Sequence, residues 1–203
     1  MSKTGKNGVT SDTAKNIPFG AGTIHKGLKC TEGVWNFANS LVGATSGGSH
    51  LVITPEYTDI NIDGVHVQVK GLTKKKTGET ATLEVNWAEL SADIIKDAIN
   101  GAVSTDDAVT GYTLLESKPD IVEGDYWDNI AFVGKTLDGR NIIVILDNAL
   151  CTNGLDLQGQ DKTQGVLTTT HECSAELSDD GEVDYDTLPY HIYYPTAAAQ
   201  INN

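Results

Sequence analysis

Residues 57–70 alternate polar and apolar side chains around a tight-turn dipeptide, Asp63-Gly64. This dipeptide predicts a two-residue hairpin loop, because a type I′ turn needs positive φ at both central positions. Pairing outward from the turn gathers one set of side chains on a mainly apolar face: Thr58, Ile60, Ile62, Val65, Val67 and Val69. The opposite face is polar and carries Tyr57, Asp59, Asn61, His66, Gln68 and Lys70. The segment therefore predicts a hairpin with one buried side and one hydrogen-bonding side.

Residues 80–87 alternate in the same way and predict a second amphipathic strand. Their apolar face carries Ala81, Leu83, Val85 and Trp87, and their polar face carries Thr80, Thr82, Glu84 and Asn86. Ser91 then offers a helix N-cap and Gly101 a stop signal, which predicts a single helix near 92–100 packed on the sheet.

Asp138-Gly139 predicts another hairpin, and both of its faces are largely apolar. A two-residue loop places Ala131, Val133, Lys135, Ile142, Val144 and Leu146 on one face. It places Ile130, Phe132, Gly134, Ile143, Ile145 and Asp147 on the other. We expect this hairpin to be covered on both sides, by a helix and a sheet or by a neighbouring subunit.

The remaining segments complete a mainly β domain at residues 19–195, a β-sandwich or barrel, with long loops and one flanking helix. A flexible arm is predicted at residues 1–18 and a polar tail at 196–203. Further strands are predicted at residues 19–28, 166–177 and 190–194, and loops at 43–49, 73–79, 152–165 and 178–184. The arm and the first three of these loops are expected to be partly disordered in a free subunit, because they cannot bury enough apolar area alone.

Charge is distributed unevenly along the chain, whose net charge is −14. Residues 1–76 contain nine lysines and five acidic residues, whereas residues 77–203 contain five basic and 23 acidic residues. The acidic part argues against nucleic-acid binding by phosphate neutralisation. The asymmetry suits head-to-tail contact between copies, although a solvated acidic surface explains it as well.

The sequence contains no recognisable catalytic, cofactor or metal site. His171 and Cys173 would share a strand face, but no second ligand pair has a convincing spacing. The acidic residues 179–186 lack the alternating ligands of a calcium loop, and no serine lies in a Gly-x-Ser-x-Gly elbow. We therefore predict a non-enzymatic protein without a cofactor.

Cysteine usage and hydropathy indicate the compartment. Cys30, Cys151 and Cys173 are odd in number and widely spaced, which argues against a disulfide framework and favours folding in a reducing cytoplasm. No apolar run approaches the roughly 20 residues of a membrane span, and no signal-peptide core is evident, so no membrane binding is expected.

The order of several short motifs resembles the major tail tube proteins of long-tailed bacteriophages that infect Gram-positive bacteria, over residues 17–195. These motifs are Phe19-Gly-Ala-Gly-Thr-Ile-His-Lys, Val42-Gly-Ala-Thr with Gly47-Gly48, Ile60-Asn-Ile-Asp-Gly-Val, Val69-Lys-Gly-Leu, Ala81-Thr-Leu-Glu, and Asp128-Asn-Ile-Ala-Phe-Val-Gly. Tube proteins of contractile tails and of type VI secretion are relatives that sequence barely separates from this family.

The resemblance implies a structural virion protein, assembled in the host cytoplasm and located in the virion tail. Copies would form hexameric rings, the rings would stack, and paired hairpins would make a continuous inner β-barrel. The implied partners are further copies, the tape-measure protein, and the tail terminator and distal tail proteins. DNA would cross the lumen during ejection without specific binding.

Two groups of residues are candidates for roles in such a tube. The predicted lumen-facing residues are Asp59, Asn61, His66, Gln68, Thr82, Glu84 and Asn86. Lys74, Lys75 and Lys76 form a predicted inter-subunit loop that meets acidic residues of a neighbouring copy.

Two other classes of protein stay open at this stage. A carbohydrate-binding β-sandwich needs an exposed aromatic platform, for which Trp35, Trp87 and Trp127 are the candidates. Trp87, however, lies on the apolar face of its predicted strand. A capsid shell or decoration protein would share the acidic, non-enzymatic character.

Overall fold

A computed structural model describes residues 8–105, 109–157, 159, 161–177 and 185–196. Its strands are β1 (Pro18–Lys26), β2 (Cys30–Thr31), β3 (Val34–Trp35), β4 (Thr45–Asp59), β5 (Lys74–Trp87), β6 (Ala102–Ser104), β7 (Leu114–Glu116), β8 (Trp127–Thr136), β9 (Asn141–Cys151), β10 (Leu167–Glu172) and β11 (Tyr190–Tyr193). Its helices are α1 (Thr13–Asn16) and α2 (Ala92–Ala98), with a 3-10 turn at Glu123–Asp125. The predicted mainly β class is therefore confirmed.

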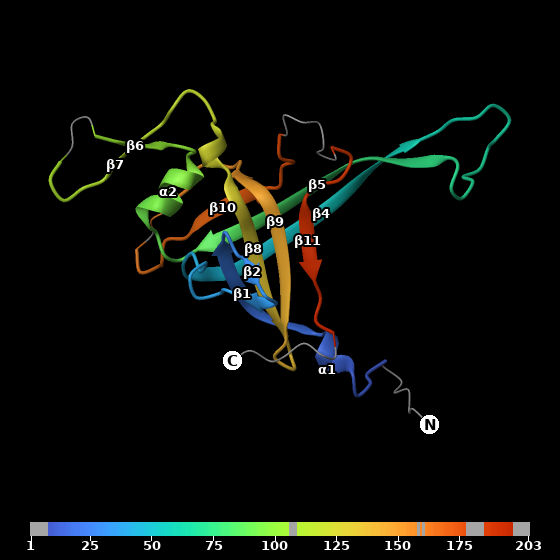
Figure 1. Ribbon diagram of the computed structural model, residues 1–203, viewed down its shortest axis with the longest axis horizontal. Helices are drawn as coiled ribbons and strands as arrows, with labels where there is room; N and C mark the ends of the chain where they lie inside the picture. The colour runs from blue at the N-terminus through green and yellow to red at the C-terminus, as the bar shows by residue number, and fades with distance from the viewer. Residues whose placement is uncertain (1–7, 106–108, 158, 160, 178–184, 197–203) are drawn as a thin grey trace.

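The main sheet is antiparallel and folds over on itself. Its strand order is β1-β8-β9-β10-β5-β4, and β11 pairs with β9 as a branch. The strands β8 and β9 cross steeply over β4 and β5 in Figure 1, which gives a sandwich-like arrangement. The link between the two halves is short, because β9 and β10 pair only where Cys151 lies opposite His171 and Leu150 opposite Glu172.

The central core lies between the two halves and is built on β5. As predicted, Ala81, Leu83, Val85 and Trp87 alternate inward, and all four are fully buried. They pack with buried side chains from the opposite half, from the helix and from the adjacent strand β10, among them Ile24, Ile94, Ala98, Ile130, Leu146 and Leu167.

Helix α2 forms where the capping signals predict it. The Ser91 hydroxyl accepts a hydrogen bond from the Ile94 N–H at 3.2 Å, which satisfies one of the free donors of the first turn. The helix ends at Ala98, and Asn100 follows with a positive φ of 46°. The buried Ile94 and Ala98 hold α2 against the end of the sheet. None of the helices in the described residues is long and apolar enough to cross a membrane.

The predicted hairpin at Asp138-Gly139 is confirmed, but its predicted register is wrong by one residue. The Gly139 N–H donates to the Thr136 oxygen at 2.8 Å, and the Thr136 N–H donates to the Arg140 oxygen at 2.8 Å. The loop therefore has three residues, and Gly139 occupies the left-handed position with φ 89°. A one-residue shift exchanges strand faces, so Ala131 lies opposite Ile145 and Val133 opposite Ile143.

Both faces of this hairpin are apolar and covered, as expected. One face contributes Ile130 and Leu146 to the central core. The other forms a second cluster with Leu28, Trp35 and Phe37, from the segment around β2 and β3. Cover on that side is therefore supplied by the chain itself.

The predicted 57–70 hairpin is wrong in its pairing. A turn is present at Asp63-Gly64, since the Val65 N–H donates to the Ile62 oxygen at 3.0 Å, but it is not the predicted type I′, because only Gly64 has a positive φ. The flanking residues form no strand pair with each other. β4 instead pairs directly with β5, with Thr58 opposite Lys75 and Leu51 opposite Leu83. This longer pairing buries Leu83, whereas the predicted one has no core to pack against.

The other loop and strand predictions have mixed outcomes. The segments 43–49 and 73–79 are wrong as loops, because β4 begins at Thr45 and β5 at Lys74. The 152–165 loop and the 190–194 strand are confirmed in their described residues, whereas the 166–177 strand is reduced to β10. The predicted acidic turn at 178–184 lies outside the described residues.

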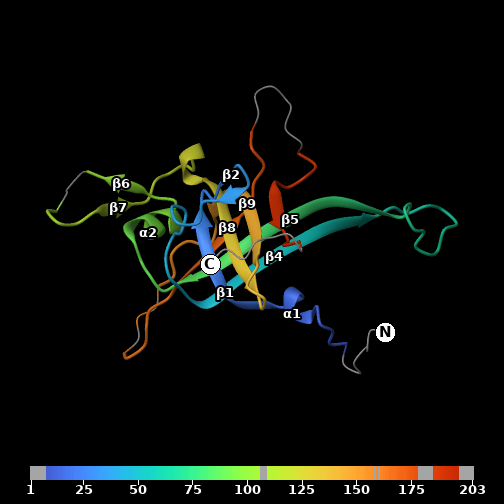
Figure 2. The same cartoon turned by 60° about the horizontal axis from the view of Figure 1, so that its bottom comes forward.

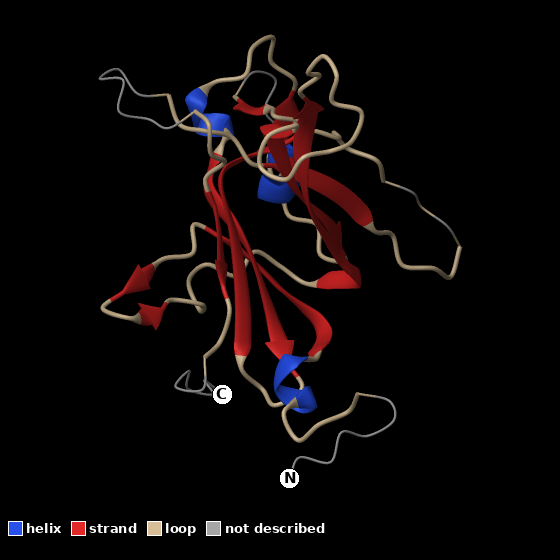
Figure 3. Ribbon diagram, turned by 90° about the vertical axis from the view of Figure 1, so that its right-hand side faces the viewer, coloured by secondary structure: helices blue, strands red, loops and turns tan. Residues whose placement is uncertain are grey.

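The chain segments near both ends are tied to the β8–β9 loop by Arg140. Its buried guanidinium donates to the main-chain oxygens of Lys15 at 2.9 Å, Pro195 at 3.2 Å and Thr196 at 3.0 Å. Helix α1 accordingly lies at the far end of the long strands from α2 (Figure 3). The boundaries of the predicted 1–18 arm and 196–203 tail stay a prediction, because residues 1–7 and 197–203 are not described.

Replacing Arg140 by methionine should lower the free energy of unfolding by more than about 4 kcal/mol. Three main-chain oxygens lose a charged donor, and hydrogen bonds to charged groups contribute roughly 1.5–3 kcal/mol each. Denaturant titration measures the loss, and hydrogen exchange should accelerate in residues 13–17 and 190–196. Lys135→Met removes an exposed cation from the same hairpin and should change stability by less than about 0.5 kcal/mol. Equal losses in the two variants would contradict the role assigned to Arg140.

Candidate assembly surfaces

The outer side of the β4, β5 and β10 strands forms a continuous polar surface. Directly opposed residues of antiparallel strands point to the same side, and the register defines two complete rows: His50, Glu84 and Thr170, then Val52, Thr82 and Glu172. Asn86 opposite Thr168 and Thr54 opposite Thr80 extend it. We call these ten residues the polar face.

The polar face is accessible, acidic and internally bonded. Its members are exposed or half-buried, while the intervening β5 residues are buried. The Thr168 hydroxyl donates to the Asn86 side-chain oxygen at 2.6 Å, and the Asn86 amide donates to the Gly48 oxygen at 3.2 Å. The face contains two glutamates, five threonines and no lysine or arginine. Such a surface offers hydrogen bonds but no cation for a phosphate.

The structure separates the predicted lumen residues into two groups. Thr82, Glu84 and Asn86 lie on the polar face, whereas Asp59, Asn61, His66 and Gln68 lie in the projecting end of the β4–β5 hairpin. The lumen prediction omitted the other seven residues of the face, which are His50, Val52, Thr54, Thr80, Thr168, Thr170 and Glu172. The last three could have been found from the alternation of residues 167–172. Leu167, Thr169 and His171 are buried on one face of this strand, and Thr168, Thr170 and Glu172 lie on its other face.

The outer sides of β4 and β10 differ in how their main-chain groups are satisfied. β4 is the last strand, and among the described residues it pairs only with β5 along its 15 residues. The outer edge of β10 is closed by Asn153, whose side chain accepts from the Thr170 N–H at 2.7 Å and donates to the Thr168 oxygen at 3.0 Å. Of these two strands, β4 is therefore the one with an open edge.

The outer part of the β4–β5 hairpin, residues 57–76, projects beyond the body in two views (Figures 1 and 2). We call it the arm. The predicted inter-subunit lysines lie in its β5 strand and not in a loop: Lys74 pairs with Asp59 at 2.9 Å and Lys76 with Glu79 at 2.8 Å. Lys75 is exposed and makes no ion pair with a described residue. Their role between subunits stays a prediction.

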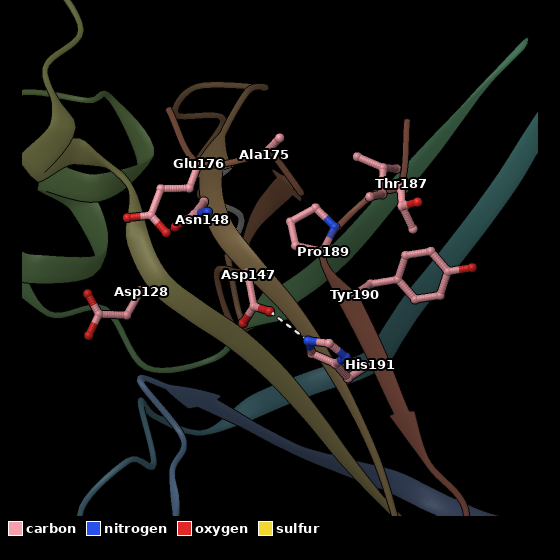
Figure 4. Close-up of a pocket in the computed structure, with 10 residues that line it drawn as sticks. Asp128, Asp147, Asn148, Ala175, Glu176, Thr187, Pro189, Tyr190 and His191 are labelled. Atoms are coloured by element: carbon pink, nitrogen blue, oxygen red, sulfur yellow. Dashed lines mark ion pairs between the residues drawn. The ribbon is translucent and has the colours of Figure 1, made fainter. Parts of the chain in front are cut away.

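A hollow of about 780 Å³ lies beside β9 and β11. Within it Asp147 and His191 point toward each other, with 3.1 Å between Oδ2 and Nε2, whereas the carboxylates of Asp128 and Glu176 point away (Figure 4). Burial raises the pKa of the Asp147 carboxyl, and the His191 ring partly offsets this. No group of metal-ligating side chains converges anywhere in the part of the chain that the structure describes.

The residues considered for a metal site belong to the core. His171 and Cys173 are buried, and the His171 ring packs on Trp127 with 4.7 Å between ring centroids. Burial raises the pKa of the Cys173 thiol to about 11, which leaves it protonated and a poor ligand. All three cysteines are free thiols, and Cys30 alone is exposed.

The tryptophans form no carbohydrate-binding platform. Trp87 and Trp127 are buried, and the half-buried Trp35 packs edge-on against Tyr193 with 4.9 Å between ring centroids. The three tryptophans therefore do not supply the exposed platform that this alternative requires of them.

The buried His171 predicts a specific loss of stability in acid. Burial lowers the pKa of His171 from 6.5 to about 4. Between these values the unfolded chain binds a proton that the folded chain does not, so stability falls with falling pH by about 3 kcal/mol. His171→Leu should remove this part of the loss in denaturant titrations near neutral pH and at about pH 4. The exposed His66 provides the control His66→Leu, and equal pH dependence in both variants would contradict the assignment.

Comparisons with known proteins return distant structural neighbours. No protein-family model matches the sequence, and no curated relative is found. A chain from the virion of a native gene transfer agent particle is 12% identical, with a TM-score of 0.40. A chain from the tail of an empty gene transfer agent particle, refined with C6 symmetry, is 11% identical, with a TM-score of 0.39. Each alignment covers 78% of this chain and 94% of the other. Similarity of this degree assigns neither fold nor function, which have to come from the geometry of this chain.

Proposed function

We propose that this chain is a structural subunit of a phage-type tail tube and not an enzyme. The observation that carries the proposal is the open β4 edge beside the polar face. A long, unpaired edge strand is a template for pairing with another chain, and monomeric proteins usually block it. Here the regular stretch of β4 between its two register shifts, Ser49 to Glu56, spans about 26 Å at roughly 3.3 Å per residue, so it offers a site for strand addition.

Strand addition at β4 continues the sheet into a neighbouring copy. When each copy adds its neighbour in the same rotational sense, the contacts close a ring, because a heterologous interface closes if its rotation does. The polar face then becomes one wall of that ring, since the other side of the sheet is the buried core. We place the polar face on the inside, which gives Thr82, Glu84 and Asn86 their predicted lumen positions.

An inner wall of this composition suits the passage of DNA. Binding to DNA without sequence preference rests on Lys and Arg contacts to phosphates, and the polar face has neither residue. Its glutamates repel the phosphate backbone. DNA therefore finds no binding site on this wall and can pass along it. In this assignment the further partners are the tape-measure, tail terminator and distal tail proteins, and the protein resides in the virion tail.

Electron microscopy of the purified protein tests the assignment directly. The proposal expects stacked hexameric rings or tubes with an open channel, formed by the protein alone or on a nucleating tail-tip complex. A shell, or a monomer that stays monomeric with such a complex present, would contradict it. The first of these results would favour a capsid protein.

The composition of the inner wall predicts how tubes interact with DNA. The double variant Thr82→Lys/Glu84→Lys should still form tubes, because both side chains point away from the core. Its tubes should retain short DNA at low salt and release it as salt rises, since each neutralised phosphate adds to the salt dependence. Retention is measured by sedimentation of labelled DNA with tubes. Glu32→Lys, an exposed site outside the polar face, serves as the control. Equal retention in both variants would rule out the inner position.

A further inference from the structure

Two projections lie at opposite ends of the longest axis of the molecule (Figure 1). One is the arm, and the other is the β6–β7 hairpin, to which we add the segment that leads from it back toward β8, residues 102–105 and 109–123 in all. We propose that the arm of one copy docks on this second projection of the next copy, which we call the receiving surface. The inference rests on the proposed function, because it names a contact that repeats the subunit along the tube.

The end of the arm presents apolar side chains that the chain itself leaves uncovered. They are Ile60, Ile62, Val65, Val67, Val69 and Leu72, and Val67 is 74% exposed. Hydrogen bonds hold this loop in shape: the Ile60 N–H donates to the Thr73 oxygen, and the Thr73 hydroxyl accepts from the Val69 N–H, both at 2.8 Å. Because the loop is already ordered, docking costs little conformational entropy.

The receiving surface is also apolar and exposed. Its uncovered side chains are Val103, Val109, Tyr112, Ile121 and Val122, and Tyr112 is 80% exposed. Tyrosine is a residue type that often anchors interfaces, and neighbouring exposed apolar groups mark interaction surfaces. Two contacts hold this segment in place: the Lys118–Asp125 ion pair and the bond from the Val122 N–H to Asp125 at 2.8 Å.

Apart from Asp63 at the turn of the arm, the exposed charges that form no ion pair with a described residue have opposite signs on the two surfaces. Lys70 and Lys75 on the arm are exposed and form no ion pair with a described residue. Glu116, Asp120 and Glu123 on the receiving surface are likewise exposed and unpaired within the described residues. Docking places the lysines of the arm near the carboxylates of the receiving surface. This attraction raises the association rate and favours the correct partner.

The same charges select head-to-tail contact. Arm-to-arm contact would bring the lysines of two copies together, and contact between two receiving surfaces would do the same for the carboxylates. Like charges at an interface disfavour both symmetric pairings. Complementary surfaces at opposite ends of a molecule instead generate a chain of copies along an axis.

Charge exchange between the two surfaces tests the docking. Lys70→Glu/Lys75→Glu should slow assembly about tenfold at low salt, where electrostatic steering raises association rates by roughly 10–10³-fold. Glu116→Lys/Asp120→Lys should do the same. The protein that carries all four changes should recover most of the wild-type rate, because the charges are again complementary.

Light scattering follows assembly, and circular dichroism checks folding. Lys135→Glu, an exposed lysine outside both surfaces, should assemble at the wild-type rate. Wild-type rates in both double variants, or no recovery in the fourfold variant, would overturn the pairing.

Cross-linking provides a second readout that does not require tubes. Two proteins are made in a Cys30→Ser background, one with Val67→Cys and one with Tyr112→Cys, and are treated with a short bis-maleimide. Their mixture should give several-fold more covalent dimer than either protein alone. Equal yields would overturn head-to-tail docking. Cross-linking without tubes would support the docking and count against the tube, whereas tubes without cross-linking would do the reverse.

Discussion

The two-residue period of β5 is the constraint on which the rest of the structure depends. Every second side chain from Ala81 to Trp87 is fully buried, so β5 can present only one side to the core. The alternate residues must then face outward, and they are polar. β5 lies between β4 and β10, and opposed residues of paired strands point to the same side. The register therefore gives β4 and β10 the same inner and outer faces as β5. One strand thereby determines both the packing of the sandwich and the chemistry of its outer surface.

Assembly in this account depends on what the chain leaves unsatisfied. Asn153 closes the outer edge of β10 and Arg140 ties down the chain segments near both ends, but nothing in the described residues pairs with the outer edge of β4. The exposed apolar residues of the arm and the receiving surface are not members of the central core. Such a subunit has a well-packed core but leaves a strand edge unpaired and apolar side chains exposed. These features are expected of a protein that joins copies of itself.

The elements that sequence analysis predicted well are those with local signals. The alternation of residues 80–87 and the Ser91 cap depend only on near neighbours, and both are present. The error at residues 57–70 has a non-local cause. The alternation there is real, but the pairing of residues 45–59 with 74–87 extends much further and buries Leu51 and Ile53 against the core. Pro55 hides this strand from a pattern search, because proline is tolerated only where a strand lies at an edge.

Of the candidate surface, the predictable part was the β5 contribution. Thr82, Glu84 and Asn86 follow from the period of a single strand, whereas the polar residues of β4 and β10 join them only through long-range register. The one-residue error at Gly139 has a similar origin, since the same dipeptide fits loops of two and of three residues. Register between distant strands depends on the whole core and is not visible in a short segment.

The most direct test of the central claim is the position of the polar face in an assembled particle. A cryo-electron microscopy map of the polymer resolves which side chains line the channel. The account predicts Thr82, Glu84 and Asn86 on the inner wall and β4 hydrogen-bonded to a strand of the adjacent copy. A map with these residues on the outer surface, or with β4 unpaired, would contradict it.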